Sequence, residues 1–269
     1  MNLSDVKLVV TDMDGTLLNE NGEISPNFYN VYDALKANDI HFVAASGRQY
    51  YSIVEKLNEI KNDITIIAEN GGITKRGNLE LAKTLLSKDN TDAIIPLLRT
   101  INDVFIVLCG KNKAYIETKD LNFPKLLSEY YTEFDTVEDL TTVNHDEFLK
   151  IAIYHPTSSE TYIYPHVKHL ESDLQVKVSG QNWLDISHKD ANKGFALQNV
   201  QKALGVTENE TMVFGDYNND LEMLERAYFS YAMENAHPNV KQVARFETKS
   251  NNEQGVEFIL EQLIASKQK

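Results

Sequence analysis

Two aspartates with a single residue between them follow an apolar run near the start of the chain. Asp12 and Asp14 lie in the stretch KLVVTDMDGTLL, residues 7–18, and a Gly and a Thr come next. A carboxylate can attack phosphorus and form an aspartyl phosphate. A second carboxyl two residues on can protonate the leaving alcohol and then deprotonate the water that cleaves that intermediate. Because Asp and Gly also favour turns, a solvated turn is the alternative interpretation.

Charge opposes the attack of a carboxylate on a phosphate dianion. Two like unit charges about 4 Å apart repel each other by roughly 4 kcal/mol at an effective dielectric constant near 20. A divalent cation would offset this repulsion, and oxygen ligands with partial hydration suit Mg²⁺. If the two aspartates do this chemistry, Mg²⁺ is therefore the expected cofactor.

The elements around the aspartates alternate between apolar, β-rich runs and segments of helical period. This order favours a parallel sheet with helices on both faces. Ligands bind off the carboxyl ends of the strands in such a sheet, which is where Asp12 and Asp14 would lie. The predicted strands are 7–11, 41–45, 64–68, 211–214 and 229–232, and the predicted helices are one starting at Pro26, 48–60, 193–204, 220–227 and 256–264.

The middle of the chain has a different pattern. Short polar turns such as residues 110–113 separate neighbouring strands there and favour antiparallel pairing. Helices are predicted at 91–101, 124–131 and 161–170, and strands at 104–109, 114–118, 149–154, 176–179 and 183–186. We therefore predict an α/β fold, with a doubly wound, Rossmann-like core at 1–84 and 187–269 and an inserted α+β domain at 85–186.

Three further motifs fall at predicted strand ends or helix starts. VAASGR contains Ser46 and Gly47, NKGFAL contains Lys193, and VFGDYNNDLEML contains Asp216, Asn219 and Asp220. In this order, with DMDGT before them and the insertion between them, they resemble the haloacid dehalogenase (HAD) superfamily. The resemblance is to its Cof-type sugar-phosphatase branch, in which a large α/β cap lies between the second and third motifs, and it spans essentially the whole chain.

The resemblance implies a role for each aspartate. Asp12 would be the nucleophile and Asp14 the general acid and base. Mg²⁺ would be held by the Asp12 side chain, the Asp14 backbone carbonyl and Asp216, with Asp220 near the waters of the metal. Family members that dehalogenate lack the second Asp, and the ion pumps carry a Thr there, so Asp14 argues for phosphatase or phosphomutase chemistry.

The resemblance also implies a set of phosphate-binding residues. The Ser46 hydroxyl, in the loop with Gly47, would donate to the phosphoryl oxygens. Lys193 would neutralise charge on that group while keeping Asp12 anionic, and Asn219 would add a hydrogen bond. Asn70 resembles a strand-end residue that faces the substrate, although Gly72 replaces the more usual Ala.

The cap would close over the site and choose the substrate. Its hinge is expected near residues 83–86 and 185–188. Asn182, Trp183 and His188 lie near its return to the core, and Trp183 is interpreted as a core residue. His166 and His169 share a helix face, but no third ligand is evident, so a solvated face is the preferred interpretation.

Composition narrows the classes of partner. With 26 Lys and Arg against 40 Asp and Glu, the net charge is −14, which argues against nucleic acid or an anionic membrane as the main partner. No apolar run approaches membrane-spanning length and no signal peptide is evident, so a cytoplasmic protein is expected. The expected partner is a small phosphorylated metabolite, and the chain would be a monomer or a homodimer.

Three functions follow in order of preference. The first is a Mg²⁺-dependent phosphatase that acts on small phosphorylated metabolites, sugar phosphates foremost. The second is a phosphomutase or phosphotransferase, which uses similar core motifs and a different acceptor. The third is a regulatory protein that keeps the fold without turnover. The sequence does not name the physiological substrate.

Overall fold

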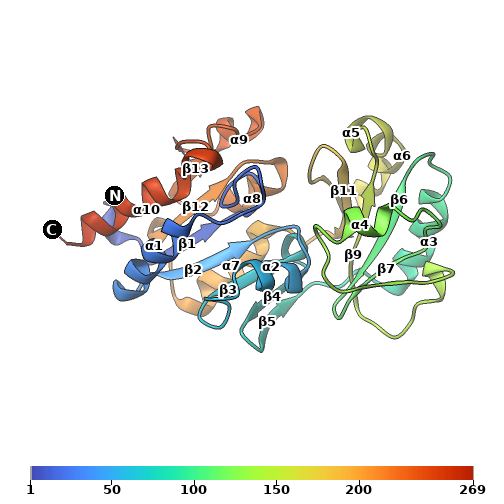
Figure 1. Cartoon of the computed structure of the whole chain (residues 1–269), viewed down its shortest axis with the longest axis horizontal. Helices are drawn as coiled ribbons and strands as arrows, with labels where there is room; N and C mark the ends of the chain where they lie inside the picture. Colours follow the sequence, from blue (N-terminus) through green and yellow to red (C-terminus); the bar gives the residue numbers. More distant parts are fainter. Residues whose placement is uncertain (1, 269) are drawn as a thin grey trace.

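The computed structural model describes residues 2–268, which form two sheets lying one after the other along the long axis of the molecule (Figure 1). The larger sheet has eight strands in the order β14-β13-β12-β1-β2-β3-β4-β5. We call this sheet and its helices the core. Its strands are β1 (Leu8–Thr11), β2 (His41–Ala45), β3 (Thr65–Ala68), β4 (Ile73–Arg76), β5 (Leu79–Lys83), β12 (Thr211–Gly215), β13 (Phe229–Ala232) and β14 (Phe246–Glu247).

The central strands of the core run parallel, as the alternating sequence pattern predicts. β1 lies between β12 and β2, with Thr11 opposite Phe214 on one side and Ala44 on the other. The segments that follow these three strands therefore emerge together at one edge of the sheet. This confirms the doubly wound, parallel-sheet class.

The edge of the core sheet departs from the predicted pattern. After β3 the chain reverses through Asn70 and Gly71, both at positive φ, and adds the antiparallel hairpin of β4 and β5. Gly71 suits this turn because a residue without Cβ adopts such a φ at little cost. The residues of β5 alternate between exposed and half-buried, so it lacks the apolar run that marks the buried strands.

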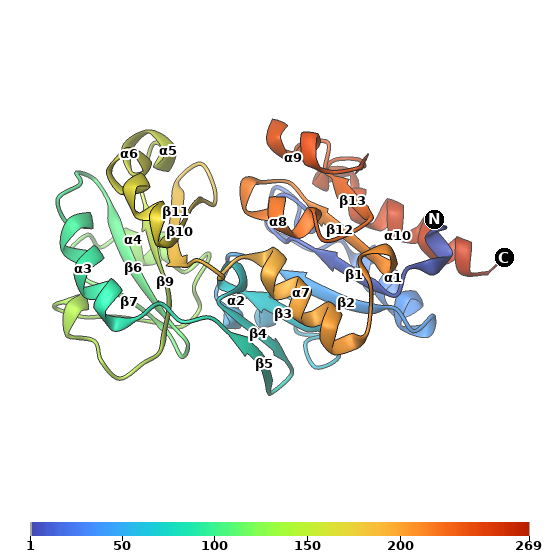
Figure 2. The same ribbon diagram turned by 180° about the vertical axis from the view of Figure 1, so that it is seen from behind.

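Helices cover both faces of the core sheet. α1 (Pro26–Ala37) and α10 (Gly255–Lys267) pack against each other on one face, and α7 (Lys193–Leu204) and α8 (Leu221–Leu224) pack together on the other, where Figure 2 shows α7 in front of the strands. The side chain of Ser25 caps α1 by accepting from the backbone N–H of Asn27. The core also contains α2 (Tyr50–Lys56) and α9 (Pro238–Val243).

The smaller sheet has six strands in the order β10-β11-β9-β6-β7-β8, and we call it with its helices the cap. Its strands are β6 (Phe105–Gly110), β7 (Ala114–Ile116), β8 (Phe134–Thr136), β9 (Phe148–Tyr154), β10 (Leu174–Val178) and β11 (Trp183–His188). Pairing is antiparallel, as predicted, except between β7 and β8. Its helices are α3 (Lys88–Leu98), α4 (Phe123–Leu127), α5 (Ser159–Tyr162) and α6 (Tyr164–Val167).

The helix predicted at 161–170 is broken into α5, α6 and a 3-10 segment, Lys168–Ser172. Pro165 stands at the start of α6. A proline inside a continuous helix lacks an N–H and collides with the preceding turn, so the helix restarts there.

The chain crosses between core and cap after β5 and after β11. The predicted boundaries at 84/85 and 186/187 stay a prediction, while β11 itself continues to His188. The start of β9 belongs to the cap sheet but also contacts the core, because Leu149 packs into the apolar cluster of the core. Over residues 2–268, no helix combines the length and the apolar character needed to cross a membrane.

Candidate active site

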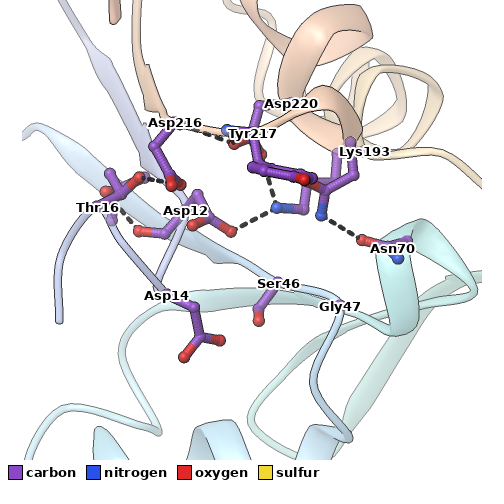
Figure 3. Close-up of polar contacts among 12 residues, drawn as sticks. Asp12, Asp14, Thr16, Ser46, Gly47, Asn70, Lys193, Asp216, Tyr217 and Asp220 are labelled. Carbon is purple, nitrogen blue, oxygen red and sulfur yellow. Dashed lines mark hydrogen bonds and ion pairs between the residues drawn. The ribbon is translucent and has the colours of Figure 1, made fainter. Parts of the chain in front are cut away.

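Three aspartates converge at the carboxyl edge of the core sheet. Asp12 follows β1, Asp216 follows β12, and Asp220 lies at the start of α8. One carboxylate oxygen from each lies within 4.8 Å of the others (Figure 3). Asp12 and Asp220 are buried, with 5% and 0% of their surface exposed. The structure thus brings together side chains that are about 200 residues apart in the sequence.

Lys193 places an ammonium group between two of these carboxylates. Its Nζ donates to Asp12 Oδ1 at 2.5 Å and to Asp220 Oδ1 at 2.7 Å. Lys193 is the first residue of α7, whose start is fixed by Asn192, the N-cap that accepts from the backbone N–H of Phe195. Burial alone would lower the pKa of Lys193, but the charges of Asp12 and Asp220 outweigh burial and raise it. The ammonium therefore stays charged.

The carboxylates are still under electrostatic stress. Burial raises the pKa of Asp12 to about 7, although Lys193 opposes this effect. Burial, followed by the charges of Asp12 and Asp220, raises the pKa of Asp216 well above its usual value. Three carboxyl groups face a single ammonium, so a further positive charge would stabilise the ionised cluster.

The Asp216 carboxylate lies directly against the backbone of Gly15, where a residue with a side chain would not fit. Gly15 has a φ of +79°, and a Cβ at this position would collide with the Asp216 carboxylate. Thr16 Oγ1 donates to Asp216 Oδ1 at 3.0 Å and so orients it. A buried, oriented set of carboxylate oxygens fits a small divalent cation such as Mg²⁺, whose preferred ligands are oxygens.

Asp220 differs from the other two aspartates because both of its oxygens are engaged. Oδ1 accepts from Lys193, and Oδ2 accepts from the backbone N–H groups of Asp216 and Tyr217 at 3.0 and 3.1 Å. Asp220 therefore orders the loop that carries Asp216.

Asp14 points away from the cluster and lies apart from it in Figure 3. Arg48 donates two hydrogen bonds to the Asp14 carboxylate, from Nε to Oδ2 and from Nη2 to Oδ1, both at 2.7 Å. The Arg48 guanidinium also donates to the backbone carbonyl of Glu129 and lies 4.9 Å from the centroid of the Tyr130 ring, both in the cap. Arg48 connects the second aspartate to the cap. Sequence reasoning missed it, although it directly follows Ser46 and Gly47.

A pocket of about 410 Å³ lies between the core and the cap. The side of the pocket formed by the cap carries aromatic and amide side chains. Gln49 of the core forms two hydrogen bonds with the backbone of Glu133 in the cap, one as donor and one as acceptor. The core contributes Asp12, Asp14, Ser46, Gly47, Arg48, Asp216 and Asn219 among others, and the cap contributes Tyr130, Tyr131, Lys150, Gln181, Asn182, Trp183 and Asp185 among others.

The structure places most of the predicted site residues on this pocket, with three exceptions. Asp220 has none of its surface exposed and lies beneath the pocket, where it accepts from Lys193. Lys193 lies behind Asp12, with none of its surface exposed. The Asn70 side chain also lies behind the pocket, because it donates to Asp185 and accepts from Asn219 Nδ2 at 3.0 Å. Trp183, interpreted from sequence as a core residue, is half-buried and lines the pocket.

Sequence reasoning also missed a charged group at the base of the cap. Lys150, Asp185 and Glu69 form a cluster in which each residue is less than 5% exposed. Lys150 lies in an otherwise apolar strand, FLKIAIY, and an isolated charge in such a run is the signal that could have drawn attention to it.

Comparisons with known proteins identify the family and agree with the fold. The family model of haloacid dehalogenase-like hydrolases matches residues 9–260. The 5-amino-6-(5-phospho-D-ribitylamino)uracil phosphatase YbjI of Escherichia coli (strain K12) is 34% identical over 262 residues, which cover 96% of each chain. The putative phosphatase YxeH of Bacillus subtilis (strain 168) is 28% identical over 269 residues, covering 97% of this chain and 99% of that one.

Solved structures show the same architecture. The crystal structure of SMU.1108c from Streptococcus mutans UA159 has a TM-score of 0.90 at 31% identity, covering 97% of this chain and 99% of the other. The HAD subclass IIB sugar phosphatase BT4131, at 21% identity, shares the fold with a TM-score of 0.83 over 96% of this chain and 98% of its own. The chain therefore belongs to the haloacid dehalogenase-like hydrolases, in their Cof-type branch, and is a phosphatase.

Proposed function

We propose that this phosphatase is Mg²⁺-dependent and hydrolyses small phosphorylated metabolites, sugar phosphates foremost, through an aspartyl phosphate on Asp12. The observation that carries the proposal is the position of Asp12, which borders the pocket between core and cap and belongs to a buried cluster with Asp216, Asp220 and Lys193. A carboxylate that is held in a fixed orientation at the wall of a pocket is suited to attack phosphorus.

Each side chain has a part in the proposed reaction. An Asp12 oxygen forms a bond to phosphorus while the ester bond to the leaving oxygen breaks, and Asp14 supplies the proton that this oxygen takes up. Asp14 then removes a proton from the water that attacks the aspartyl phosphate, so that Asp12 and inorganic phosphate are released. Ser46 and Asn219 donate hydrogen bonds to the phosphoryl oxygens. Lys193, which lies behind Asp12, keeps that carboxylate ionised and oriented rather than touching the phosphoryl group.

The acidic cluster supports the choice of metal. Asp12, Asp216 and the backbone carbonyl of Asp14 would hold Mg²⁺, and Asp220 would order the loop that presents Asp216. When bound, Mg²⁺ would neutralise part of the charge that accumulates between the nucleophile and the phosphoryl group.

The proposed substrate class rests on the pocket and on the relatives. Amide and aromatic side chains from the cap, among them Asn182 and Trp183, would contact the leaving alcohol. Two relatives are named as phosphatases of 5-amino-6-(5-phospho-D-ribitylamino)uracil, a polyol phosphate, so this compound belongs beside the sugar phosphates in any substrate screen. We also propose that residues 85–186 move as one cap domain, and that the protein works in the cytoplasm as a monomer or homodimer.

The test is phosphate release from a panel of sugar phosphates, the ribitylaminouracil phosphate, nucleotides and an aryl phosphate, each with Mg²⁺ and with excess chelator. We expect release that requires the metal and favours one compound. Undiminished release in chelator would refute the metal assignment. An isomeric sugar phosphate in place of free phosphate would assign a phosphomutase, and no product from any ester would point to a regulatory protein.

A further inference from the structure

The Lys150 ammonium is the centre of a buried contact between the cap and the core. Lys150 lies near the start of β9, where its neighbour Leu149 already packs into the core. Its Nζ lies 3.1 Å from Asp185 Oδ2 in the cap and 3.0 Å from Glu69 Oε2 in the core. Burial alone would lower the pKa of Lys150, but the charges of Asp185 and Glu69 outweigh burial and raise it. The ammonium is therefore charged.

The third contact of this ammonium is with the loop of Ser46 and Gly47, which we call the phosphate loop. Lys150 Nζ donates to the backbone carbonyl of Gly47 at 2.8 Å. An ammonium has three N–H donors; two of them donate to Gly47 and Asp185, and Glu69 is held as an ion pair that accepts no hydrogen bond. Lys150 borders the pocket but is only 2% exposed, and its ammonium is directed at these buried partners.

The Gly47 carbonyl belongs to the same planar peptide group as the Arg48 N–H, and the two point in opposite directions. Arg48 N–H donates to Ser46 Oγ at 3.1 Å. When Lys150 fixes the carbonyl, it also fixes this N–H. The Ser46 oxygen then acts as an acceptor, and its own proton is free for a phosphoryl oxygen.

A second branch leaves the same cluster. Asp185 accepts from the Asn70 amide, and Asn70 Oδ1 accepts from Asn219 Nδ2 at 3.0 Å. Asn219 lines the pocket beside Ser46. The two polar side chains proposed to bind the phosphoryl group are thus both connected to the Lys150–Asp185 ion pair at the base of the cap.

We propose that Lys150 of the cap is a positioning residue for the phosphoryl site, acting on Ser46 through the Gly47–Arg48 peptide and on Asn219 through Asp185 and Asn70. The cap would then complete the phosphate site as well as cover it. This inference rests on the proposed function, since it requires that Ser46 binds the phosphoryl group.

The test is a double-mutant cycle of Lys150→Met and Ser46→Ala. We expect Lys150→Met to lower kcat/KM for phosphate release by about 10- to 100-fold. This loss should not exceed the loss expected when a hydrogen-bond donor that contacts the transition state directly is removed. If Lys150 acts mainly through Ser46, Lys150→Met should lower kcat/KM by no more than about threefold in the Ser46→Ala background, because effects within one hydrogen-bond network are not additive. Fully additive losses would refute the route through Ser46, and additive losses of Lys150→Met with Asn219→Ala as well would overturn the proposal.

Binding of inorganic vanadate, with Mg²⁺ present, gives a readout that does not depend on turnover. Trp183 is the single tryptophan and lines the pocket, so its fluorescence reports the binding. We expect about tenfold weaker binding in Lys150→Met. If the wild-type protein binds vanadate but releases no phosphate from any ester, the proposed function fails while Lys150 is still tested. If vanadate does not bind to the wild-type protein, both fail.

The matched control is Lys177→Met. Lys177 of β10 also bridges the cap to the core, with its Nζ 2.5 Å from Glu222 Oε1, but this half-buried pair does not contact the loop of Ser46 and Gly47. Equal losses in Lys177→Met and Lys150→Met would show general cap docking and overturn the proposal. Because Lys150→Met leaves buried carboxylates without their cation, Lys150→Met with Glu69→Gln serves as the second variant if the first does not fold, with the same expected losses.

Discussion

Asp12→Asn should make the metal-free protein more stable while abolishing its activity. The pKa of Asp12 rises from 3.8 to about 7, mainly through burial. A folded-state pKa above the unfolded value means that stability present at low pH is lost as the pH rises. At about 1.4 kcal/mol per pH unit, the ionised Asp12 costs roughly 4 kcal/mol by pH 8. Asn carries no charge, and its amide oxygen can still accept from Lys193.

The pH dependence gives the prediction its sign. Roughly 2 of these 4 kcal/mol are lost between pH 5 and pH 7, so the advantage of Asp12→Asn should grow over that interval. The assay is urea unfolding in excess chelator at pH 5 and pH 8, with Asp33→Asn on the exposed face of α1 as the matched control. Added Mg²⁺ should stabilise the wild-type protein more than the variant and narrow the difference.

Two results would refute this reasoning. If Asp12→Asn were less stable than the wild-type protein in chelator at pH 8, the cluster would not be under the electrostatic stress inferred here. If the difference were the same at pH 5 and pH 8, Asp12 would not titrate between these values in the folded protein.

Asp14→Asn should lower phosphate release by at least about 100-fold with unchanged circular dichroism, as expected for loss of a general acid and base; activity within tenfold of the wild-type value would remove Asp14 from that role. Lys193→Met leaves the buried carboxylates without their ammonium and should lower the free energy of unfolding in chelator by about 3–5 kcal/mol, measured by urea unfolding. Adding Asp12→Asn should recover part of that loss, and no recovery would contradict the assignment. Burial, helped by Arg76, lowers the pKa of His41 from 6.5 to about 4, so stability should fall as the pH drops from 6.5 to 4. His41 is only half-buried, so the discounted loss is roughly 1–2 kcal/mol, and a His41→Asn variant should lack it.

Local patterns in the sequence predicted the core and its reactive edge. Alternating strand and helix periods identify a parallel sheet because each period depends only on neighbouring residues. Asp12, Ser46 and Asp216 each follow a buried strand, and the carboxyl ends of parallel strands meet at one edge. The hairpin of β4 and β5 escaped this reasoning because an edge strand of exposed and half-buried residues carries no apolar run.

The tertiary structure alone decided how the charges pair. Nothing local indicates that Arg48 grips Asp14, or that Lys150 reaches the Gly47 carbonyl across 103 positions in the chain. Asn70, expected to face the substrate, is instead engaged with Asp185 and Asn219. A buried charge must find a partner among whatever side chains the fold brings within about 3 Å. Sequence periodicity shows which residues are buried, whereas the packing of distant segments determines which of them meet.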